Sequence, residues 1–319
     1  MIRPLAARYP GAAAMTEIVA ELLAYVRAKH PRSLAGVEEA RRLDPARFDG
    51  YADLLVGWAM RALGDRAIAR TVDAFALFSS DVNMAQGRYE ASGSYEHKSY
   101  RGCYEAVYAD KATMDDYLWG VYLTNFMWVH HLDISAFFET RFVAKLPARA
   151  ALIELAPGHG GWGLVAMHRR PDARLDGFDI SPSSIEISRA LAAAAGLADR
   201  ARYELRDALD LTSHPAGVAD ACICNFLVEH LEDPDRLFQV IEHVLAPGGK
   251  AFVSGALTAA QVDHIYEFRR ESELVLLAER HGMRVLETLS VQPQRTLPRA
   301  QFLPRSMSLI VQKRTREHW

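Results

Sequence analysis

The chain has 319 residues, of which 50% are hydrophobic, and its formal net charge is −3. This balance is typical of an ordinary globular protein, because disordered tails are poor in apolar residues and proteins that bind nucleic acid through charge are strongly basic. A chain of this length suggests about two domains or one enlarged domain.

The most apolar parts of the chain give no sign of export or of membrane insertion. Residues 1–19 lack the uninterrupted apolar core of a secretory signal, and residues 117–129 are well short of the roughly 20 residues that cross a bilayer. Cys222 and Cys224 lie two apart in a predicted strand, where they would share a face, so we expect buried thiols rather than a disulfide. We predict a cytoplasmic protein with neither a membrane nor a nucleic acid as partner.

The first half of the chain shows helical periodicity. Residues 15–80 place apolar side chains at three- and four-residue intervals, which predicts several amphipathic helices and no strand. Residues 83–108 lose this period and gather tyrosines and glycines, which indicates a partly irregular segment. Residues 114–142 are apolar on nearly every side, so we expect a helix packed between its neighbours. Residues 1–145 are thus predicted to form an all-α cap over the substrate and are a candidate for homodimer contacts.

After Pro147 the pattern changes to short apolar runs that alternate with helical segments. This alternation predicts crossover connections and a mostly parallel sheet with helices on both faces. No helix separates the last two runs, so the last strand should be antiparallel. We predict a seven-stranded, Rossmann-like α/β domain in residues 146–319, with strands near 151–156, 174–179, 201–206, 219–226, 249–254, 283–291 and 306–313.

A glycine-rich stretch follows the first predicted strand. Residues 154–163 read ELAPGHGGWG, in which Gly158, Gly160 and Gly163 satisfy the G-x-G-x-x-G spacing of a dinucleotide-binding turn. Glycines allow a tight turn, and the helix that follows presents free N–H groups to a negatively charged group. Asp179 ends the next predicted strand, where an acid accepts hydrogen bonds from ribose hydroxyls. NAD and S-adenosylmethionine fit this arrangement equally well.

Two later segments resemble the class I S-adenosylmethionine-dependent methyltransferases. Residues 219–234, ADACICNFLVEHLEDP, place an EH-x-x-DP helix start after the fourth predicted strand, and residues 244–253, VLAPGGKAFV, place a Leu-x-Pro-Gly-Gly turn before the fifth. A terminal antiparallel strand pair also distinguishes that family from NAD-binding domains. The resemblance covers roughly residues 150–314, about half of the chain, whereas residues 1–145 carry no motif that we assign.

The resemblance implies S-adenosylmethionine as the cofactor and a role for several residues. The family's acidic-x-Gly-x-Gly-x-Gly loop falls on Glu154, Ala156, Gly158 and Gly160, with Ala156 in place of the first glycine. Glu154 would aid the ammonium group of the cofactor, and Asp179 would accept from the ribose hydroxyls. Taken singly, these residues are equally typical of helix caps and turns. The other implied contacts are Ile180 on adenine, Asp207 with Ala208 at the adenine amino group, and Asn225 near the methionine end.

Methyl transfer mainly requires the protein to align the acceptor with the S–CH3 bond, but a hydroxyl or ammonium acceptor also needs a base. The catalytic candidates are Glu229 and His230 after the fourth strand, and His130 or His131 on the apolar helix. Adjacent helical residues diverge by about 100°, so at most one of the last pair should face a given pocket. Each candidate is also consistent with a capping or core role. We predict no metal site.

The tyrosines of residues 89–108 have two interpretations. Tyr95 and Tyr100 are candidates for a lid whose hydroxyls reach the cofactor, or the tyrosines dock this segment on the core with their hydroxyls in water. We predict a methyltransferase for a small-molecule acceptor in specialised metabolism, with O- or N-methylation favoured over C-methylation. A protein that binds the cofactor without methyl transfer and an NAD-dependent oxidoreductase are the alternatives.

Overall fold

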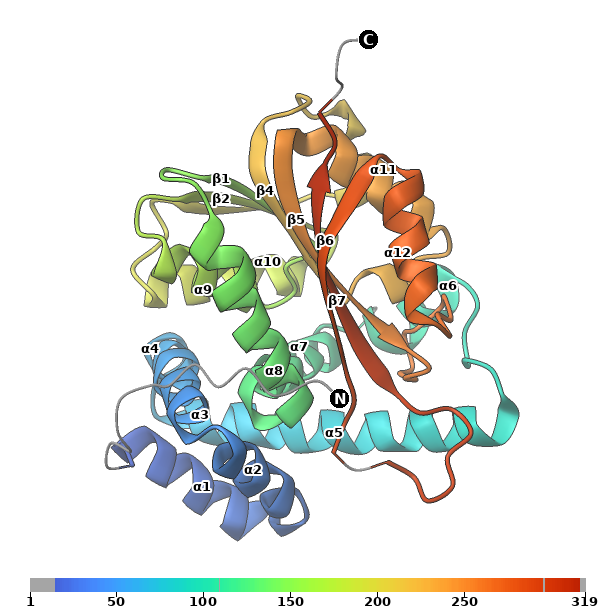
Figure 1. Cartoon of the computed structure of the whole chain (residues 1–319). Helices are drawn as coiled ribbons and strands as arrows, with labels where there is room; N and C mark the ends of the chain where they lie inside the picture. Colours follow the sequence, from blue (N-terminus) through green and yellow to red (C-terminus); the bar gives the residue numbers. More distant parts are fainter. Residues whose placement is uncertain (1–14, 109, 295, 316–319) are drawn as a thin grey trace.

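The structure is a computed structural model that describes residues 15–108, 110–294 and 296–315 (Figure 1). The prediction of no secretory signal rests largely on residues 1–14, which lie outside the described residues. Across the described ranges, no helix is both long enough and apolar enough to cross a membrane.

Seven strands form one sheet in the order β3-β2-β1-β4-β5-β7-β6 (Figure 1). Neighbouring strands are parallel except where β7 is involved, since β7 is antiparallel to both β5 and β6. The predicted fold class, a mostly parallel sheet with its last strand reversed, is therefore confirmed. The strands are β1 (Ala151–Leu155), β2 (Arg174–Asp179), β3 (Ala201–Leu205), β4 (Ala219–Asn225), β5 (Leu245–Leu257), β6 (Met283–Val291) and β7 (Arg305–Lys313).

The two faces of the sheet contribute to two apolar cores because successive strand residues point to opposite faces. Leu152 and Ile223 belong to the first core, with side chains of α9 and α10. Cys222 and Cys224 belong to the second, with side chains of α11 and α12, and both are buried free thiols as predicted. The helices that cover the sheet are α9 (Gly161–Arg169), α10 (Pro182–Ala194), α11 (Pro234–Val244) and α12 (Glu271–Arg280).

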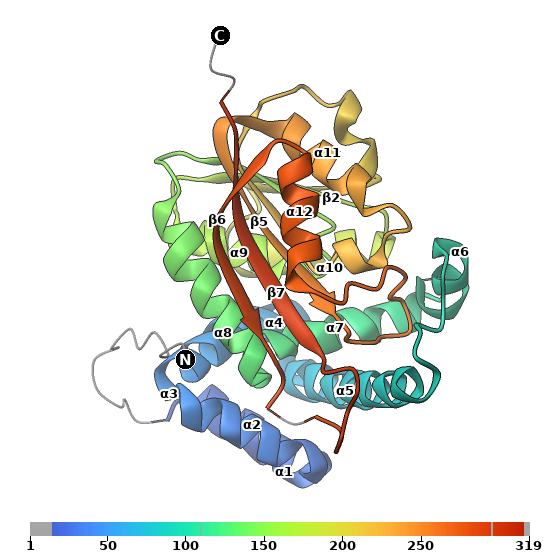
Figure 2. The ribbon, with the colours of Figure 1, turned by 45° about the vertical axis from the view of Figure 1, so that its right-hand side comes forward.

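The N-terminal helices lie at the end of the sheet toward which β5 points, and α5 runs across this end (Figures 1 and 2). Their side chains share the first core with the sheet, as shown by Phe126 and Phe252. The helical region and the sheet are therefore packed as one unit. The helices are α1 (Glu17–Lys29), α2 (Pro31–Leu43), α3 (Pro45–Tyr51), α4 (Gly57–Leu63), α5 (Ala67–Ser92), α6 (Tyr100–Cys103), α7 (Lys111–Met127) and α8 (Val129–Phe137).

Two helix boundaries differ from the sequence-based expectation. Helix α5 continues to Ser92, well into the segment that was expected to be irregular. The helix expected over residues 114–142 is interrupted at Trp128, whose backbone is extended (φ −101°, ψ 126°). The ring of Trp128 stacks on Phe78 and His130, so a tertiary contact accompanies this break.

Gly163 lies in the first turn of α9, where the absence of a side chain allows close packing. A methyl group added here would lie 2.6 Å from Leu175 Cδ2 and closer still to the Glu154 carboxylate. We expect Gly163→Ala to lower the free energy of unfolding, measured by urea denaturation, by about 1–3 kcal/mol. The matched control is Gly36→Ala in α2, where an added methyl group meets nothing within 4 Å and should be neutral or stabilising. Equal effects of the two substitutions would contradict close packing at Gly163.

Candidate active site

The loop between β1 and α9 contains three residues with a left-handed backbone. The φ angle is 49° at Ala156, 58° at Gly158 and 72° at Gly160. Ala156 thus adopts the conformation that normally favours glycine, although it carries a methyl group. The Gly158 amide donates to Asp179 at 3.0 Å, and Ser188 Oγ donates to the Gly158 carbonyl at 3.0 Å. These contacts hold the loop in a tight turn whose backbone a ligand can approach closely.

Asp179 ends β2 beside this loop. Its Oδ2 accepts from the Gly158 amide, and its Oδ1 accepts from the Ser181 amide at 2.9 Å. Burial raises the pKa of Asp179 to about 6, and these backbone hydrogen bonds oppose the rise. Each carboxylate oxygen has a further lone pair, so Asp179 is able to accept two ribose hydroxyls.

Glu154 lies below the loop, in the interior. Its Oε1 accepts from the Gly163 amide at 2.9 Å, while its Oε2 has no hydrogen-bond partner within the described residues. Burial raises the pKa of Glu154 to about 8. The side chain is only 2% exposed, so it supports the start of α9, and its predicted aid to the cofactor's ammonium group stays a prediction.

Stability should fall with rising pH because of Glu154. Its ordinary pKa is 4.5 and its folded-state pKa is about 8, so between these values the folded protein holds a proton that the unfolded chain has released. The resulting stability is complete below pH 4.5 and is lost as the pH rises toward 8, by up to about 1.4 kcal/mol per pH unit. Glu154→Gln removes this titration and keeps an acceptor for Gly163. Between about pH 5.5 and about pH 7.5, the free energy of unfolding measured with urea should fall more for wild type than for Glu154→Gln. Equal falls in the two proteins would rule out the buried proton.

Two large apolar side chains are exposed at the ends of β2 and β3. Ile180 is 48% exposed and Leu205 is 55% exposed. Asp207 is also exposed and accepts from the Leu209 amide at 2.8 Å, whereas Ala208 is buried. An apolar surface next to a carboxylate suits adenine and its amino group, and the roles that the resemblance implies for these residues stay predictions.

Tyr95 and Tyr100 lie in different environments. Tyr100 is 41% exposed, and its ring stacks on Tyr108 with ring centroids 6.1 Å apart. Tyr95 is buried, donates to the Ala259 carbonyl at 3.0 Å and packs against His264. The contacts of Tyr95 correspond to the docking interpretation, whereas the lid role of Tyr100 stays a prediction.

Asn225 ends β4, the strand next to β1. Ser254 Oγ donates to Asn225 Oδ1 at 2.9 Å, and the Asn225 Nδ2 atom is buried without an acceptor in the described part of the chain. A buried donor without a partner is costly. This amide is therefore a donor available to a ligand, as expected near the methionine end of the cofactor.

A cavity of about 790 Å³ lies where the N-terminal helices meet this end of the sheet. Its volume suits a small ligand, since pockets for such molecules span about 300–1,000 Å³. Side chains from α5, α7 and α8, from the segment after β4 and from the loop after β5 line it. The lining includes five aromatic side chains and all four catalytic candidates: Phe75, Phe78, Tyr117, Trp128, Phe226, His130, His131, Glu229 and His230.

His130 and His131 both line this cavity, which corrects the expectation that at most one of them would face a given pocket. They lie in the first turn of α8 with ring centroids 4.5 Å apart, and the cavity is wide enough to reach both rings. Burial lowers the pKa of His130 to about 3 and that of His131 well below its ordinary value. Both rings are therefore neutral near pH 7.

Hydrogen bonds define the protonation of the His131 ring. Thr124 Oγ1 donates to the Val121 carbonyl at 2.7 Å, so the same oxygen acts as acceptor for His131 Nδ1 at 3.0 Å. Nδ1 therefore carries the hydrogen, and Nε2 keeps its lone pair. The ring stacks on Phe226, the residue after β4, with centroids 5.0 Å apart. His131 thus offers a neutral base close to the end of β4.

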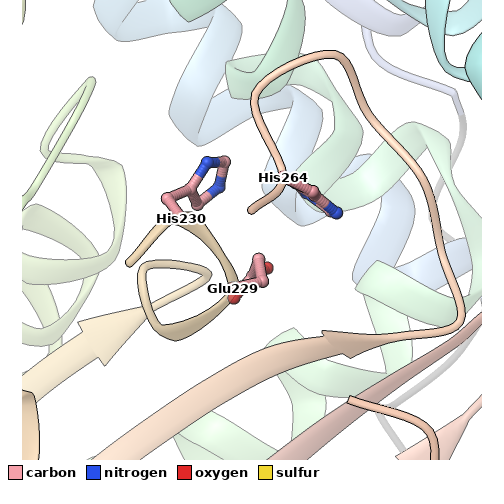
Figure 3. A group of neighbouring side chains, drawn as sticks. All are labelled: Glu229, His230 and His264. Atoms are coloured by element: carbon pink, nitrogen blue, oxygen red, sulfur yellow. The ribbon is translucent and has the colours of Figure 1, made fainter. Parts of the chain in front are cut away.

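Glu229, His230 and His264 form a cluster in the cavity wall (Figure 3). The first two come from the turn η7 (Val228–His230) after β4, and His264 comes from the loop after β5. One potential ligand atom from each lies within 4.8 Å of the other two. The sequence prediction named Glu229 and His230 but missed His264, which no local motif marks.

The reversed β7 strand, the glycine turn after β1 and the acid that ends β2 together define the fold of a class I S-adenosylmethionine-dependent methyltransferase. Residues 153–253 match the family described as methyltransferase domain. The chain therefore carries a methyltransferase domain of this class, and S-adenosylmethionine is the cofactor that the domain implies.

Several curated relatives are similar to this part of the chain. A ubiquinone biosynthesis O-methyltransferase from Xanthomonas axonopodis pv. citri is 30% identical over 34% of this chain and 44% of its own length. A demethylmenaquinone methyltransferase from Thermus thermophilus is 35% identical over 34% of this chain and 47% of its own. An ajmaline N-methyltransferase from Rauvolfia serpentina is 29% identical over 32% of this chain and 34% of its own length. The chain thus matches less than half the length of these relatives.

Among solved structures, an S-adenosylmethionine-dependent methyltransferase from Methanosarcina mazei aligns with a TM-score of 0.46 and 16% identity, over 55% of this chain and 98% of that one. The cyclase SpnF aligns with a TM-score of 0.47 and 17% identity, over 58% of this chain and 83% of that one. Both alignments leave more than a third of this chain without a counterpart.

Proposed function

We propose that the chain transfers a methyl group from S-adenosylmethionine to a small molecule bound in the cavity. The observation that carries this proposal is the position of the cavity, whose wall includes Phe226, the residue after Asn225 at the end of β4. Ligands of parallel α/β sheets bind beyond the carboxyl ends of the strands. A cofactor held by the loop after β1 therefore faces this cavity, and when bound it supplies an activated methyl group.

The chain's own residues would bind and position the two reactants. Asp179 and Asp207 accept from the adenosine hydroxyls and amino group, and Asn225 donates at the methionine end. The N-terminal helices cover the acceptor and exclude water, which favours alignment over hydrolysis.

The lining of the cavity favours an acceptor with a flat apolar surface and a polar group to methylate. Aromatic rings such as Trp128 and Phe226 pack well against a flat apolar surface. Neutral histidines can accept the proton that the polar group loses when it is methylated. The relatives include both an O- and an N-methyltransferase, so oxygen and nitrogen are the favoured acceptor atoms. A biosynthetic role in specialised metabolism, a cytoplasmic location and a homodimer through the N-terminal helices stay parts of this proposal.

Two measurements test the proposed function. Calorimetric titration should show binding of S-adenosylmethionine and S-adenosylhomocysteine but not of NAD, and phenol and amine panels should reveal an acceptor that releases S-adenosylhomocysteine. Binding of NAD without response to the sulfur compounds would instead indicate an oxidoreductase. Binding of the sulfur compounds without transfer to any acceptor would instead indicate a protein that uses the cofactor for another purpose.

A further inference from the structure

The cluster of Glu229, His230 and His264 has the composition of a metal site. Two imidazoles and one carboxylate suit divalent first-row transition cations such as Zn²⁺ and Co²⁺. Glu229 is 0% exposed and His264 is 1% exposed, so this is not a patch of surface acids. Figure 3 shows the three side chains gathered between η7 and the loop that carries His264.

Both histidines are oriented in the way that metal-binding histidines usually are. His264 Nδ1 lies 2.7 Å from the Ala259 carbonyl, and His230 Nδ1 lies 3.0 Å from the Asp263 carbonyl. A carbonyl only accepts, so each Nδ1 carries a hydrogen, and the neutral form of each ring has its lone pair on Nε2, where a metal ion can bind. Ring N–H donation to a carbonyl or carboxylate is the typical support of a metal-ligating histidine.

Glu229 has an unused oxygen in this cluster. Its Oε1 accepts from the Ala256 amide at 3.2 Å, whereas its Oε2 is buried and has no hydrogen-bond partner within the described residues. A buried carboxylate oxygen without a donor is costly unless a cation compensates it. The unpartnered oxygen therefore points to a ligand that the protein atoms themselves do not provide.

A second buried carboxylate, that of Asp263, lies beside the cluster. Asp263 is 0% exposed, and its Oδ2 accepts from Tyr108 Oη at 2.9 Å and lies 3.4 Å from His230 Nδ1. In the part of the chain that the structure describes, no lysine or arginine pairs with Glu229 or Asp263. One divalent ion would balance the charge of these two buried carboxylates.

Backbone hydrogen bonds hold η7 and the loop that carries His264 together. The Glu229 carbonyl accepts from the amides of Ile265 at 2.8 Å and Tyr266 at 2.9 Å. His264 is therefore held against η7 by main-chain contacts, and side-chain rotation is enough to adjust the site. Ligand atoms around Zn²⁺ lie about 3–4 Å apart, so a shift of about 1 Å would close this cluster on an ion.

We propose that Glu229, His230 and His264 bind a divalent transition-metal cation in the wall of the cavity. All three residues line the cavity, so the ion would keep coordination positions open toward the acceptor. An oxygen of the acceptor is the ligand that fits these positions. This last step rests on the proposed methyl transfer, whereas binding of the ion itself does not.

Zinc titration of the full chain after treatment with a chelator tests the site without cofactor or acceptor. Wild type should bind about one Zn²⁺ per chain, and His264→Gln should weaken this binding by about 100-fold or more. His168→Gln is the matched control, because His168 is an exposed histidine outside the cavity wall, and it should bind like wild type. Equal binding by His264→Gln and wild type, or no binding by wild type, would overturn the site.

Two further measurements keep the test independent of folding defects. Electron paramagnetic resonance of Cu²⁺ bound to wild type should show two imidazole nitrogens, and fewer than two would refute the ligand set. Asp263→Asn removes the buried carboxylate charge beside His230 but keeps the Asp263 carbonyl and an oxygen for Tyr108, and it should weaken Zn²⁺ binding by about 10-fold to 100-fold with retained stoichiometry. Since Zn²⁺ binding is read directly, its failure is distinguishable from failure of methyl transfer.

Discussion

Asp179→Ala should weaken S-adenosylmethionine binding by about 100-fold. The carboxylate is placed to accept two ribose hydroxyls, and hydrogen bonds to a charged group contribute about 1.5–3 kcal/mol each. Losing both costs at least about 3 kcal/mol, which corresponds to a factor of about 100 in the dissociation constant. The substitution also removes the acceptor for the Gly158 amide, so the glycine loop loses a contact at the same time. Calorimetric titration measures the effect.

The matched control for this experiment is Asp176→Ala. Asp176 lies three residues earlier on the same strand, and its exposed side chain precedes the strand end that meets the loop. It should bind the cofactor like wild type, and both variants should unfold cooperatively near the wild-type midpoint. Unchanged affinity in Asp179→Ala would refute the assignment of the ribose site.

The sheet could be predicted closely because its signals are local. Most strands are short apolar runs bounded by turn residues, and the bounds predicted for the last two strands agree with β6 and β7 to within one residue. The exception is β5, which begins at Leu245 and includes the Leu-Ala-Pro-Gly-Gly segment that was expected to be a turn before it. The interruption at Trp128 could not be predicted in this way, because apolar residues continue on both sides of it. It coincides with stacking of the Trp128 ring on Phe78, which lies 50 residues earlier in the chain.

The candidate site was predictable to the extent that its residues occur in ordered motifs. Glu154 and Asp179 could be predicted because they lie at the ends of the first two predicted strands. The structure places Asp179 in contact with the glycine loop. His264 lies in no motif and is brought to Glu229 by main-chain contacts in a loop. The angular argument about His130 and His131 was wrong because it assumed a narrow pocket, whereas the cavity is large enough for both residues to line it.

His131 contacts both the end of β4 and an N-terminal helix. Its ring stacks on Phe226 from the end of β4, while its Nδ1 hydrogen is directed to Thr124 on α7. A single side chain thus connects the end of β4 with the N-terminal helices, between the proposed positions of cofactor and acceptor. We therefore regard His131 as the leading candidate for the base among the four residues predicted from sequence.

His131→Gln should lower kcat by about 100-fold or more with the cofactor's dissociation constant unchanged, because a positioned base contributes about 10²–10⁴-fold to the rate. The pKa of His131 lies well below its ordinary value of 6.5, so the base form is populated throughout neutral pH. The wild-type kcat at saturating cofactor should then stay flat as the pH falls through 6.5, with no acid limb at that pH.

His130→Gln is the matched control for this prediction, since His130 lines the same cavity and is its neighbour in sequence. No Thr124 contact fixes its tautomer, so we expect less than a 10-fold change in kcat. The opposite order of effects would assign the base to His130. An acid limb near pH 6.5 that disappears in His131→Gln would show that cofactor and acceptor restore an ordinary pKa to this ring, and would contradict a base kept neutral by burial.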